Sequence, residues 1–169
     1  MKNIVLIGMM GCGKTTVGGL LAARLGRELA DTDAWVEARE GRTIAQIFAD
    51  EGETYFRDRE RDAAAELARR QDLVIACGGG LPLRPDSIGC LKESGVVFWL
   101  NRDPGETYDA LDTGGRPLAQ DGRAAFVDRY RQRASVYRAC ADYIIQGAES
   151  AQSAADAVVE RLARKEGDQ

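Results

Sequence analysis

Short apolar runs alternate along the chain with stretches whose apolar residues recur at helical spacing. Four such runs predict buried strands: Ile4–Ile7, Leu73–Ala76, Val96–Leu100 and Tyr143–Ile145. Helical spacing is clearest in three stretches: Thr15–Leu25, Arg57–Arg70 and Ala154–Ala163. Buried strands separated by helices predict an α/β fold with a parallel sheet covered on both faces. Such sheets bind ligands at the carboxyl ends of their strands.

A glycine-rich segment joins the first predicted strand to the first predicted helix. From Gly8 to Thr15 it matches the phosphate-loop pattern G-x-x-x-x-G-K-[ST] at every fixed position, and the flanking strand and helix argue against a chance glycine-rich turn. Glycines let backbone N–H groups converge on phosphates, and the helix N-terminus adds positive potential. Lys14 is expected to reach the β- and γ-phosphates and the Thr15 hydroxyl to bind Mg²⁺. The residues expected to bind ATP are Gly8, Gly11, Cys12, Gly13, Lys14, Thr15 and Thr16.

Composition narrows the chemistry that this site can use. The 169 residues suit one domain. The chain has no histidine, so any catalysis must be carried by carboxylates, lysine, arginine and a metal ion. A net charge of −4, with acidic residues interleaved among the arginines, disfavours a nucleic-acid partner. No apolar run approaches the roughly 20 residues that cross a bilayer, and the start of the chain does not resemble a signal sequence. Four cysteines without C-x-x-C spacing predict reduced thiols in a cytoplasmic protein, and the lack of a long apolar face favours a monomer.

Two carboxylates follow the short stretch Glu28–Ala30. If that stretch is the second strand, Asp31 and Asp33 lie at its carboxyl end, beside the phosphate loop. One carboxylate could then hold a water of the Mg²⁺ shell, and the other could accept a proton from a substrate hydroxyl. The alternative, of equal weight on the pattern alone, is that they cap a helix that begins near Ala34.

Three consecutive glycines follow the predicted strand Leu73–Ala76. At the carboxyl end of a strand, they would allow a ligand to approach the backbone closely. A tight turn is the alternative, although such a turn needs only one or two glycines. The three residues are Gly78, Gly79 and Gly80.

Three arginines are further candidates, each with a plainer alternative. Arg57 lies at the start of a helix that a turn enters, and on the pattern alone a capped helix with a solvated, charged face is the favoured explanation. Arg116 lies in a stretch rich in Gly, Asp and Thr, which suits either a mobile lid or an ordinary surface loop. Carried by a lid, it would stabilise charge on a transferring phosphoryl group. Arg133 shares a helix face with Tyr137, four residues later, and on its own it is predicted to be a surface arginine.

Taken together, these segments resemble the shikimate kinase family. The family pattern runs from a phosphate loop through D-T-D, G-E-x-x-F-R-x-x-E, G-G-G and R-P-L to R-x-x-x-Y-x-x-x-A. The chain carries these motifs in that order, as Gly8–Thr15, Asp31–Asp33, Gly52–Glu60, Gly78–Gly80, Arg116–Leu118 and Arg133–Ala141. The resemblance extends from Lys2 to about Leu162, and the ordered set is far more specific than the phosphate loop alone.

The resemblance implies a fold and a reaction. The fold is a P-loop kinase fold in one domain, residues 1–169, with a five-stranded parallel sheet of order 2-3-1-4-5, flanking helices and a mobile lid at about 107–122. The reaction is transfer of the γ-phosphoryl group of MgATP to the 3-hydroxyl of shikimate, a step of aromatic amino acid biosynthesis.

The resemblance also implies roles for individual residues. Asp33 corresponds to the carboxylate that holds the shikimate hydroxyls and is the expected base. Arg57 and Arg133 correspond to the arginines that grip the substrate carboxylate. Arg116 corresponds to the lid arginine at the phosphates, and Asp31 to the outer-shell carboxylate of Mg²⁺. Backbone contacts to the substrate are implied for Gly78, Gly79 and Gly80.

Some positions depart from the family pattern. Ala119 stands where the lid often has leucine, and no basic residue lies between Arg102 and Arg116, although the family usually has one there near the adenine. We expect these changes to affect adenine affinity and lid closure rather than phosphate chemistry. The loop Gln146–Ser150 is expected to flank the adenine.

Two other functions are compatible with a phosphate loop. One is a small kinase of the same fold that acts on gluconate or a nucleoside monophosphate, but the paired arginines, D-T-D and G-G-G favour a hydroxylated carboxylic acid. The other is a non-catalytic nucleotide-binding module. Such a module is expected to have lost Lys14, Asp33 or Arg116, and all three are present.

Overall fold

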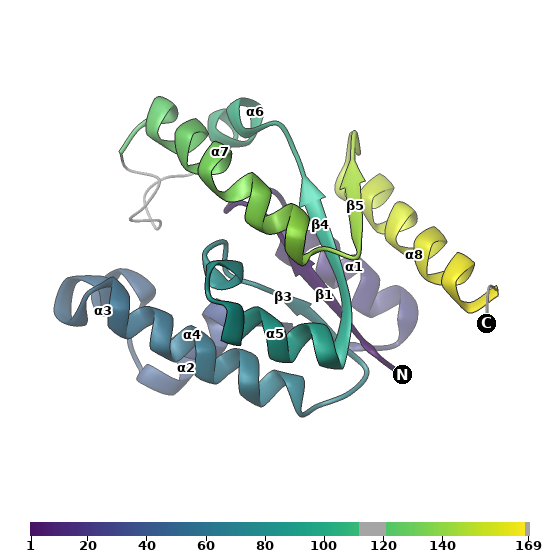
Figure 1. Cartoon of the computed structure of the whole chain (residues 1–169), viewed down its shortest axis with the longest axis horizontal. Helices are drawn as coiled ribbons and strands as arrows, with labels where there is room; N and C mark the ends of the chain where they lie inside the picture. Colours follow the sequence, from purple (N-terminus) through teal and green to yellow (C-terminus); the bar gives the residue numbers. More distant parts are fainter. Residues whose placement is uncertain (112–120, 168–169) are drawn as a thin grey trace.

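Strands and helices alternate along most of the chain (Figure 1). The computed structural model describes residues 1–111 and 121–167. The strands are β1 (Asn3–Ile7), β2 (Glu28–Asp31), β3 (Leu73–Ala76), β4 (Gly95–Asn101) and β5 (Tyr143–Gln146). The helices are α1 (Lys14–Leu25), α2 (Thr32–Glu40), α3 (Ile44–Glu51), α4 (Glu53–Ala68), the short 3-10 helix η1 (Leu81–Leu83), α5 (Pro85–Ser94), α6 (Pro104–Asp109), α7 (Arg123–Cys140) and α8 (Ala151–Gly167).

The five strands form one parallel sheet in the order β2-β3-β1-β4-β5 (Figure 1). The predicted strand order is thus confirmed. In the central strand, Val5 lies opposite Ile75 of β3 and Val97 of β4. The chain leaves β1 toward β2 and β3 and later crosses to β4, so the carboxyl end of β1 is the point at which the connections diverge. Ligand crevices of open α/β sheets form at such points.

Alternate residues of the central strand face two separate cores. Val5 and Ile7 pack with side chains of α4, α5 and α7, whereas Ile4 and Leu6 pack with side chains of α1 and α8. Figure 1 shows α5 and α7 in front of the sheet and α1 behind it. Because both faces are covered, the three inner strands β1, β3 and β4 are apolar along most of their length instead of alternating between apolar and polar residues.

Helices α2, α3 and α4 form a lobe beside the sheet (Figure 1). The lobe has a small core of its own, in which Val36, Ile47 and Ala63 are fully buried and Phe56 nearly so. A capping box begins α3, because the Thr43 side chain accepts from the Gln46 N–H and the Gln46 side chain accepts from the Thr43 N–H.

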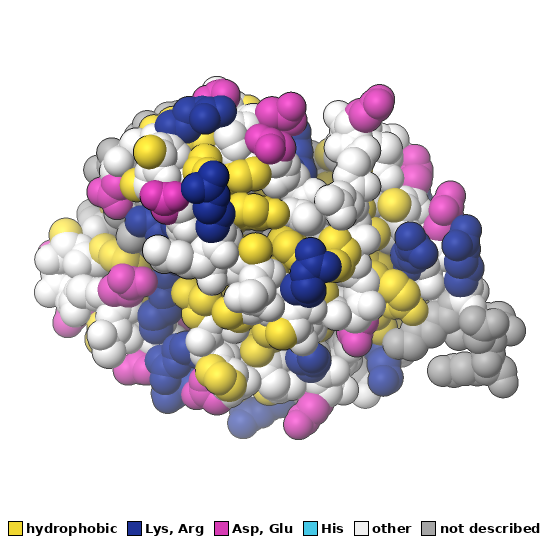
Figure 2. All heavy atoms as spheres, turned by 45° about the horizontal axis from the view of Figure 1, so that its top comes forward, with side chains coloured by type: hydrophobic (Ala, Val, Ile, Leu, Met, Phe, Trp, Pro, Cys, Tyr) yellow, Lys and Arg dark blue, Asp and Glu magenta, His cyan; other side chains and the backbone are white. Residues whose placement is uncertain are grey.

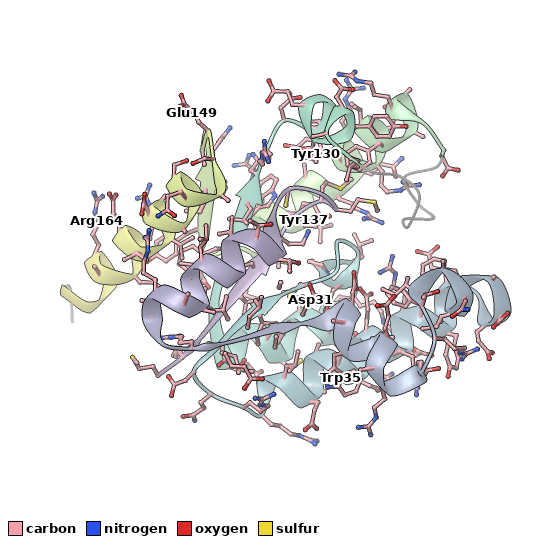
Figure 3. The ribbon with its side chains drawn as sticks, turned by 180° about the vertical axis from the view of Figure 1, so that it is seen from behind. Asp31, Trp35, Tyr130, Tyr137, Glu149 and Arg164 are labelled. Atoms are coloured by element: carbon pink, nitrogen blue, oxygen red, sulfur yellow. The ribbon has the colours of Figure 1, made fainter. Side chains whose placement is uncertain are left out.

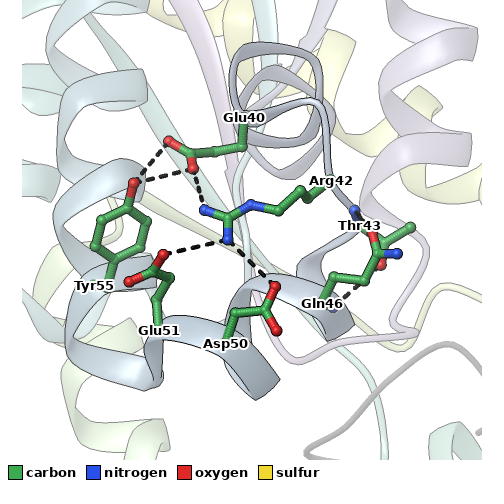
Figure 4. A network of polar contacts seen from close by, with 7 residues as sticks. All are labelled: Glu40, Arg42, Thr43, Gln46, Asp50, Glu51 and Tyr55. Carbon is green, nitrogen blue, oxygen red and sulfur yellow. Dashed lines mark hydrogen bonds and ion pairs between the residues drawn. The ribbon is translucent and has the colours of Figure 1, made fainter.

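A polar network ties the three helices of this lobe together (Figure 4). The Arg42 guanidinium, between α2 and α3, donates to Glu40 at 2.8 Å, Glu51 at 3.3 Å and Asp50 at 3.4 Å. The Tyr55 hydroxyl of α4 donates to the same Glu40 carboxylate. The lobe is therefore held by charge at its rim as well as by its apolar core.

Three helices begin earlier than the sequence pattern indicates. Helix α4 begins at Glu53, so Arg57 lies one turn inside it, and α8 begins at Ala151. Helix α2 begins at Thr32, two residues before Ala34, because the Asp31 side chain accepts from the backbone at its first turn. The predicted lid, residues 107–122, overlaps the end of α6, and Arg116 lies outside the described residues.

One face of the molecule is mixed in charge. On the face shown in Figure 2, lysine and arginine side chains lie among aspartate and glutamate side chains, without a continuous basic stripe. Across residues 1–111 and 121–167, no helix has the length and apolar character needed to span a membrane.

Candidate active site

A cavity of about 460 Å³ lies at the carboxyl ends of β1, β2 and β3. It brings together segments that are far apart in the sequence: the phosphate loop, the start of α2, helix α4, the glycine loop after β3, and α7. Most candidate residues line it, namely Gly11, Gly13, Lys14, Thr15, Thr16, Asp31, Asp33, Arg57, Gly78, Gly79, Gly80 and Arg133. Gly8 and Cys12 do not line it, and the position of Arg116 is not described.

The phosphate loop has the backbone that its glycines allow. Gly8, Gly11 and Gly13 adopt φ angles of 148°, 78° and 97°, where residues with a side chain are strained. Gly13 places no side chain over the N-terminus of α1, so the first backbone N–H groups of the helix stay available to an anion. The Lys14 ammonium is buried and donates to the carbonyl oxygens of Gly8 and Met9, both at 2.8 Å.

Two oxygen-bearing side chains meet beside the phosphate loop. The Thr15 hydroxyl donates to Asp31 Oδ2 at 2.8 Å. The other oxygen of Asp31 accepts from the backbone N–H groups of Asp33 and Ala34, which fixes the carboxylate in place. The cap suggested as an alternative for this motif is therefore present, and Asp31 faces the phosphate loop as well. A hydroxyl and a carboxylate held together are the hard oxygen ligands that suit Mg²⁺.

Two carboxylates converge on the glycine loop within the same cavity. Asp33 Oδ1 and Glu60 Oε1 both lie against Gly78, and neither has a hydrogen-bond partner within the described part of the chain. Desolvation, followed by the negative charges of Glu60 and Asp31, raises the pKa of Asp33 to about 7, against the opposing effect of Lys14 and Arg57. Burial likewise raises the pKa of Glu60, and Arg57 opposes the rise. A partner that offers hydroxyl donors would satisfy both oxygens.

Two arginines lie next to these carboxylates. Arg57 donates to Glu60 Oε2 at 2.6 Å and to Glu53 at 3.1 Å, and its guanidinium lies directly over Gly80. Arg133 is only 6% exposed, and its Nη1 atom has no hydrogen-bond partner among the described residues. The surface position predicted for Arg133 from its spacing alone is wrong, because the face of α7 that carries Arg133 packs against the sheet.

The three consecutive glycines are explained by close approach. None of them has a positive φ, so conformation does not require glycine. Instead, a Cβ at Gly78 would meet the carboxylates of Glu60 and Asp33, and one at Gly80 would meet the Arg57 guanidinium. A Cβ at Gly79 would lie 3.2 Å from the backbone nitrogen of Met10 in the phosphate loop. Each glycine therefore makes room for a different functional group.

Some residues at this site carry no assignment from the sequence. Glu60 follows Arg57 by three residues, in an R-x-x-E spacing that puts both side chains on one helix face. That spacing could have indicated that Glu60 lies at the site. Thr32 is fully buried, and its hydroxyl accepts from the Gly78 N–H at 2.8 Å. The apolar wall of the cavity comes from α3 and α4, with the side chains Ile44, Phe48 and Phe56. Nothing in the local pattern distinguished these side chains from ordinary core residues.

A second, smaller cavity of about 40 Å³ lies on the other side of the phosphate loop. Cys12 and Gly13 line it together with Arg102, Ala148 and Ser150. The loop Gln146–Ser150, which the sequence predicted beside the adenine, thus contributes to a hollow next to the phosphate loop.

Comparison with known proteins agrees with this geometry. The shikimate kinase family model matches residues 10–163. The shikimate kinase of Burkholderia lata is 42% identical over 147 residues, 85% of this chain and 80% of that protein. The shikimate kinase of Pelotomaculum thermopropionicum is 41% identical over 165 residues, 96% of each chain.

Solved structures give the same result. The shikimate kinase from Acinetobacter baumannii, in complex with shikimate, superposes with a TM-score of 0.93 at 36% identity, covering 98% of this chain and 94% of that one. The enzyme from Aquifex aeolicus superposes with a TM-score of 0.84 at 30% identity, covering 95% of each chain. A deoxyadenosine kinase from M. mycoides, at 12% identity and a TM-score of 0.61, shares the fold alone. Because the family model matches residues 10–163, most of this chain, the chain belongs to the shikimate kinase family.

Proposed function

We propose that this protein is a shikimate kinase, which transfers the γ-phosphoryl group of ATP to the 3-hydroxyl of shikimate and releases ADP. One observation carries the proposal. Buried polar atoms that have no hydrogen-bond partner among the described residues share a cavity with a phosphate loop. When ionised, the carboxylates of Asp33 and Glu60 act only as hydrogen-bond acceptors, and Arg133 Nη1 acts only as a donor. Shikimate carries hydroxyl groups for the carboxylates and a carboxylate for the arginines, so it complements this set.

The proposed mechanism assigns the acceptor side to four residues. Arg57 and Arg133 bind the carboxylate of shikimate, for which planar guanidinium groups are suited. Asp33 and Glu60 accept hydrogen bonds from its hydroxyls. Asp33 also takes the proton of the 3-hydroxyl as that oxygen attacks the γ-phosphorus, a role that suits a carboxyl with a pKa of about 7.

The proposed mechanism assigns the donor side to the phosphate loop. Lys14 and the N-terminus of α1 bind the phosphates and stabilise the charge that develops during transfer. Thr15 and Asp31 would hold Mg²⁺, which neutralises phosphate charge when bound. Arg116 is assigned to the transferring phosphoryl group on the motif alone, because it lies outside the described residues.

The test is a coupled assay of ADP release with ATP and Mg²⁺. Shikimate, gluconate, AMP and no acceptor are compared at the same enzyme concentration. Turnover that depends on shikimate supports the proposal. Turnover with gluconate or AMP alone would favour the other small-molecule kinases of this fold. Tight ATP binding without turnover on any acceptor would favour a non-catalytic module.

We also propose that the protein is a single-domain, cytoplasmic monomer that binds neither nucleic acid nor membranes. The interspersed surface charge supports the first of these exclusions. Light scattering after size-exclusion chromatography should give the mass of one chain, and a mass twice as large would contradict the monomer.

A further inference from the structure

Tyr137 contacts both the glycine loop and the phosphate loop, whose separation sets the distance between the two substrates. It is fully buried on α7, near the start of α1 (Figure 3). Its hydroxyl donates to the carbonyl oxygen of Gly79 at 2.6 Å and lies 3.5 Å from Met9 Sδ in the phosphate loop. One side chain therefore reaches both the glycine loop and the phosphate loop.

The bond to Gly79 fixes the orientation of a whole peptide unit. The described chain contains no cis peptide bond, and in a trans peptide the carbonyl and the next N–H point in opposite directions. A Gly79 carbonyl held against Tyr137 therefore turns the Gly80 N–H away from α7. Within the described residues this N–H has no hydrogen-bond partner, and the Arg57 guanidinium lies over the same glycine. The N–H is thus a free donor beside an arginine.

The position of Gly79 is also constrained from the other side. A Cβ there would lie 3.2 Å from Met10 N, 3.4 Å from Gly8 O and 3.6 Å from Arg133 Nη1. Gly79 is therefore the point at which the glycine loop touches the phosphate loop. A shift of this peptide would change the distance between a molecule bound at the glycines and a phosphate bound at the loop.

We propose that Tyr137 is a positioning residue, whose hydroxyl holds the Gly79–Gly80 peptide so that the Gly80 N–H donates to the carboxylate of the acceptor. This inference rests on the proposed function, because it requires an acceptor with a carboxylate. Burial raises the pKa of Tyr137 to about 12, although Arg133 opposes the rise, so the hydroxyl keeps its proton and remains a donor near neutral pH.

The test compares Tyr137→Phe with Tyr130→Phe. Tyr130 lies on the same helix and donates one hydrogen bond of its own, to Asn101 Oδ1 at 2.8 Å, away from the glycine loop (Figure 3). Titration calorimetry measures the binding of shikimate and of ATP separately. We expect Tyr137→Phe to raise the dissociation constant for shikimate about three- to tenfold, the range for one neutral hydrogen bond, and to leave that for ATP unchanged. Tyr130→Phe should leave shikimate binding unchanged.

A second ligand separates positioning from a structural effect. In an analogue of shikimate with methyl in place of the carboxylate, no oxygen remains that could accept a hydrogen bond from the Gly80 N–H. The wild type and Tyr137→Phe should bind this analogue with equal affinity, although both bind it more weakly than the wild type binds shikimate.

The outcomes distinguish the two proposals. Equal shikimate affinity of wild type and Tyr137→Phe, or equal losses for both tyrosine variants, would overturn the positioning role and leave the proposed function intact. Loss of analogue binding by Tyr137→Phe, parallel to its loss of shikimate binding, would also overturn it. A wild type that binds ATP but not shikimate would refute the proposed function, and the positioning role with it.

Discussion

Asp33 and Glu60 are carboxylates that folding has moved out of water and toward each other, with Gly78 between them. An ionised carboxylate in such a place is unfavourable, and the pKa of Asp33 rises for that reason. The same rise suits the role of base near neutral pH that we propose for Asp33. The positive charges of Lys14 and, to a smaller extent, Arg57 oppose the rise in the pKa of Asp33.

Replacement of Asp33 by Asn tests its role as base. The variant should bind ATP as the wild type does, since within the described residues Asp33 makes no hydrogen bond to the phosphate loop. Its kcat should fall by about 10²-fold or more. In the wild type, kcat/KM for shikimate should fall below a pH of about 7, as the carboxylate takes up a proton. The Asn variant should lack this fall. A variant with near-normal kcat would remove Asp33 from the catalytic role.

The same substitution should affect stability in a direction set by pH. The pKa of Asp33 is higher in the folded protein, about 7, than its ordinary value of 3.8, so the ionised group destabilises the folded, ligand-free protein. This penalty grows as pH rises from about 4 to about 7 and is complete above that range. Asp33→Asn should therefore raise Tm more at pH 8 than at pH 5. Asp128→Asn, on an exposed residue of α7, should shift Tm equally at both values, and equal gains for Asp33→Asn would contradict the prediction.

A methyl group at Gly78 should block the acceptor end of the cavity. Gly78→Ala would push its Cβ into the carboxylates of Glu60 and Asp33, so shikimate-dependent turnover should be lost while ATP binding is retained. Gly89→Ala, on α5, is the matched control, because its Cβ would enter open space. That control should keep its activity and gain about 0.5–1 kcal/mol of stability from the higher helix propensity of alanine. An active Gly78→Ala enzyme would show that the carboxylates can move apart.

At the scale of elements, the site is assembled from loops that follow the strands and from a wall of apolar side chains on helices outside the sheet. The phosphate loop and the glycine loop extend from the carboxyl ends of buried strands, which hold them rigidly. The apolar wall, with Ile44 and Phe48, belongs to α3, which contacts the rest of the protein mainly through α2 and α4. The ion-pair network around Arg42 in Figure 4 closes this lobe at its rim. The position of the wall should therefore depend on electrostatics.

Arg42→Met should loosen α3 and with it the acceptor pocket. Because three carboxylates lose a shared partner, KM for shikimate should rise about two- to fivefold, while KM for ATP stays the same. Added salt should raise KM for shikimate in the wild type and have less effect on the variant. Arg24→Met removes an exposed ion pair with Asp156 between α1 and α8 and should leave KM for shikimate unchanged. An Arg42→Met enzyme with an unaltered KM would show that the apolar core alone holds the lobe.

At the scale of the whole molecule, the parts of the fold that follow from local pattern were predictable and the parts that depend on packing were not. Four of the strands and the phosphate loop follow from continuous apolar runs and from a motif whose glycines have a direct physical reason, whereas the order of the strands was implied by the family resemblance. The burial of Arg133 and the orientation of Tyr137 depend on how α7 docks against the sheet, which spacing along one helix does not reveal. Glu60 was visible in the pattern, but its meeting with Asp33 at Gly78 requires α2, α4 and β3 together.

The ammonium of Lys14 already has two oxygen partners before any phosphate arrives, the carbonyls of Gly8 and Met9. In the proposed reaction, nucleotide binding exchanges these bonds for bonds to phosphate, so the net gain is a difference between two favourable states. When ADP leaves, the Lys14 ammonium can again donate to the carbonyl oxygens of Gly8 and Met9, so it is not buried without a hydrogen-bond partner. We therefore expect these two carbonyls to lower the barrier to departure of ADP, so that tight binding of the triphosphate does not slow release of the product.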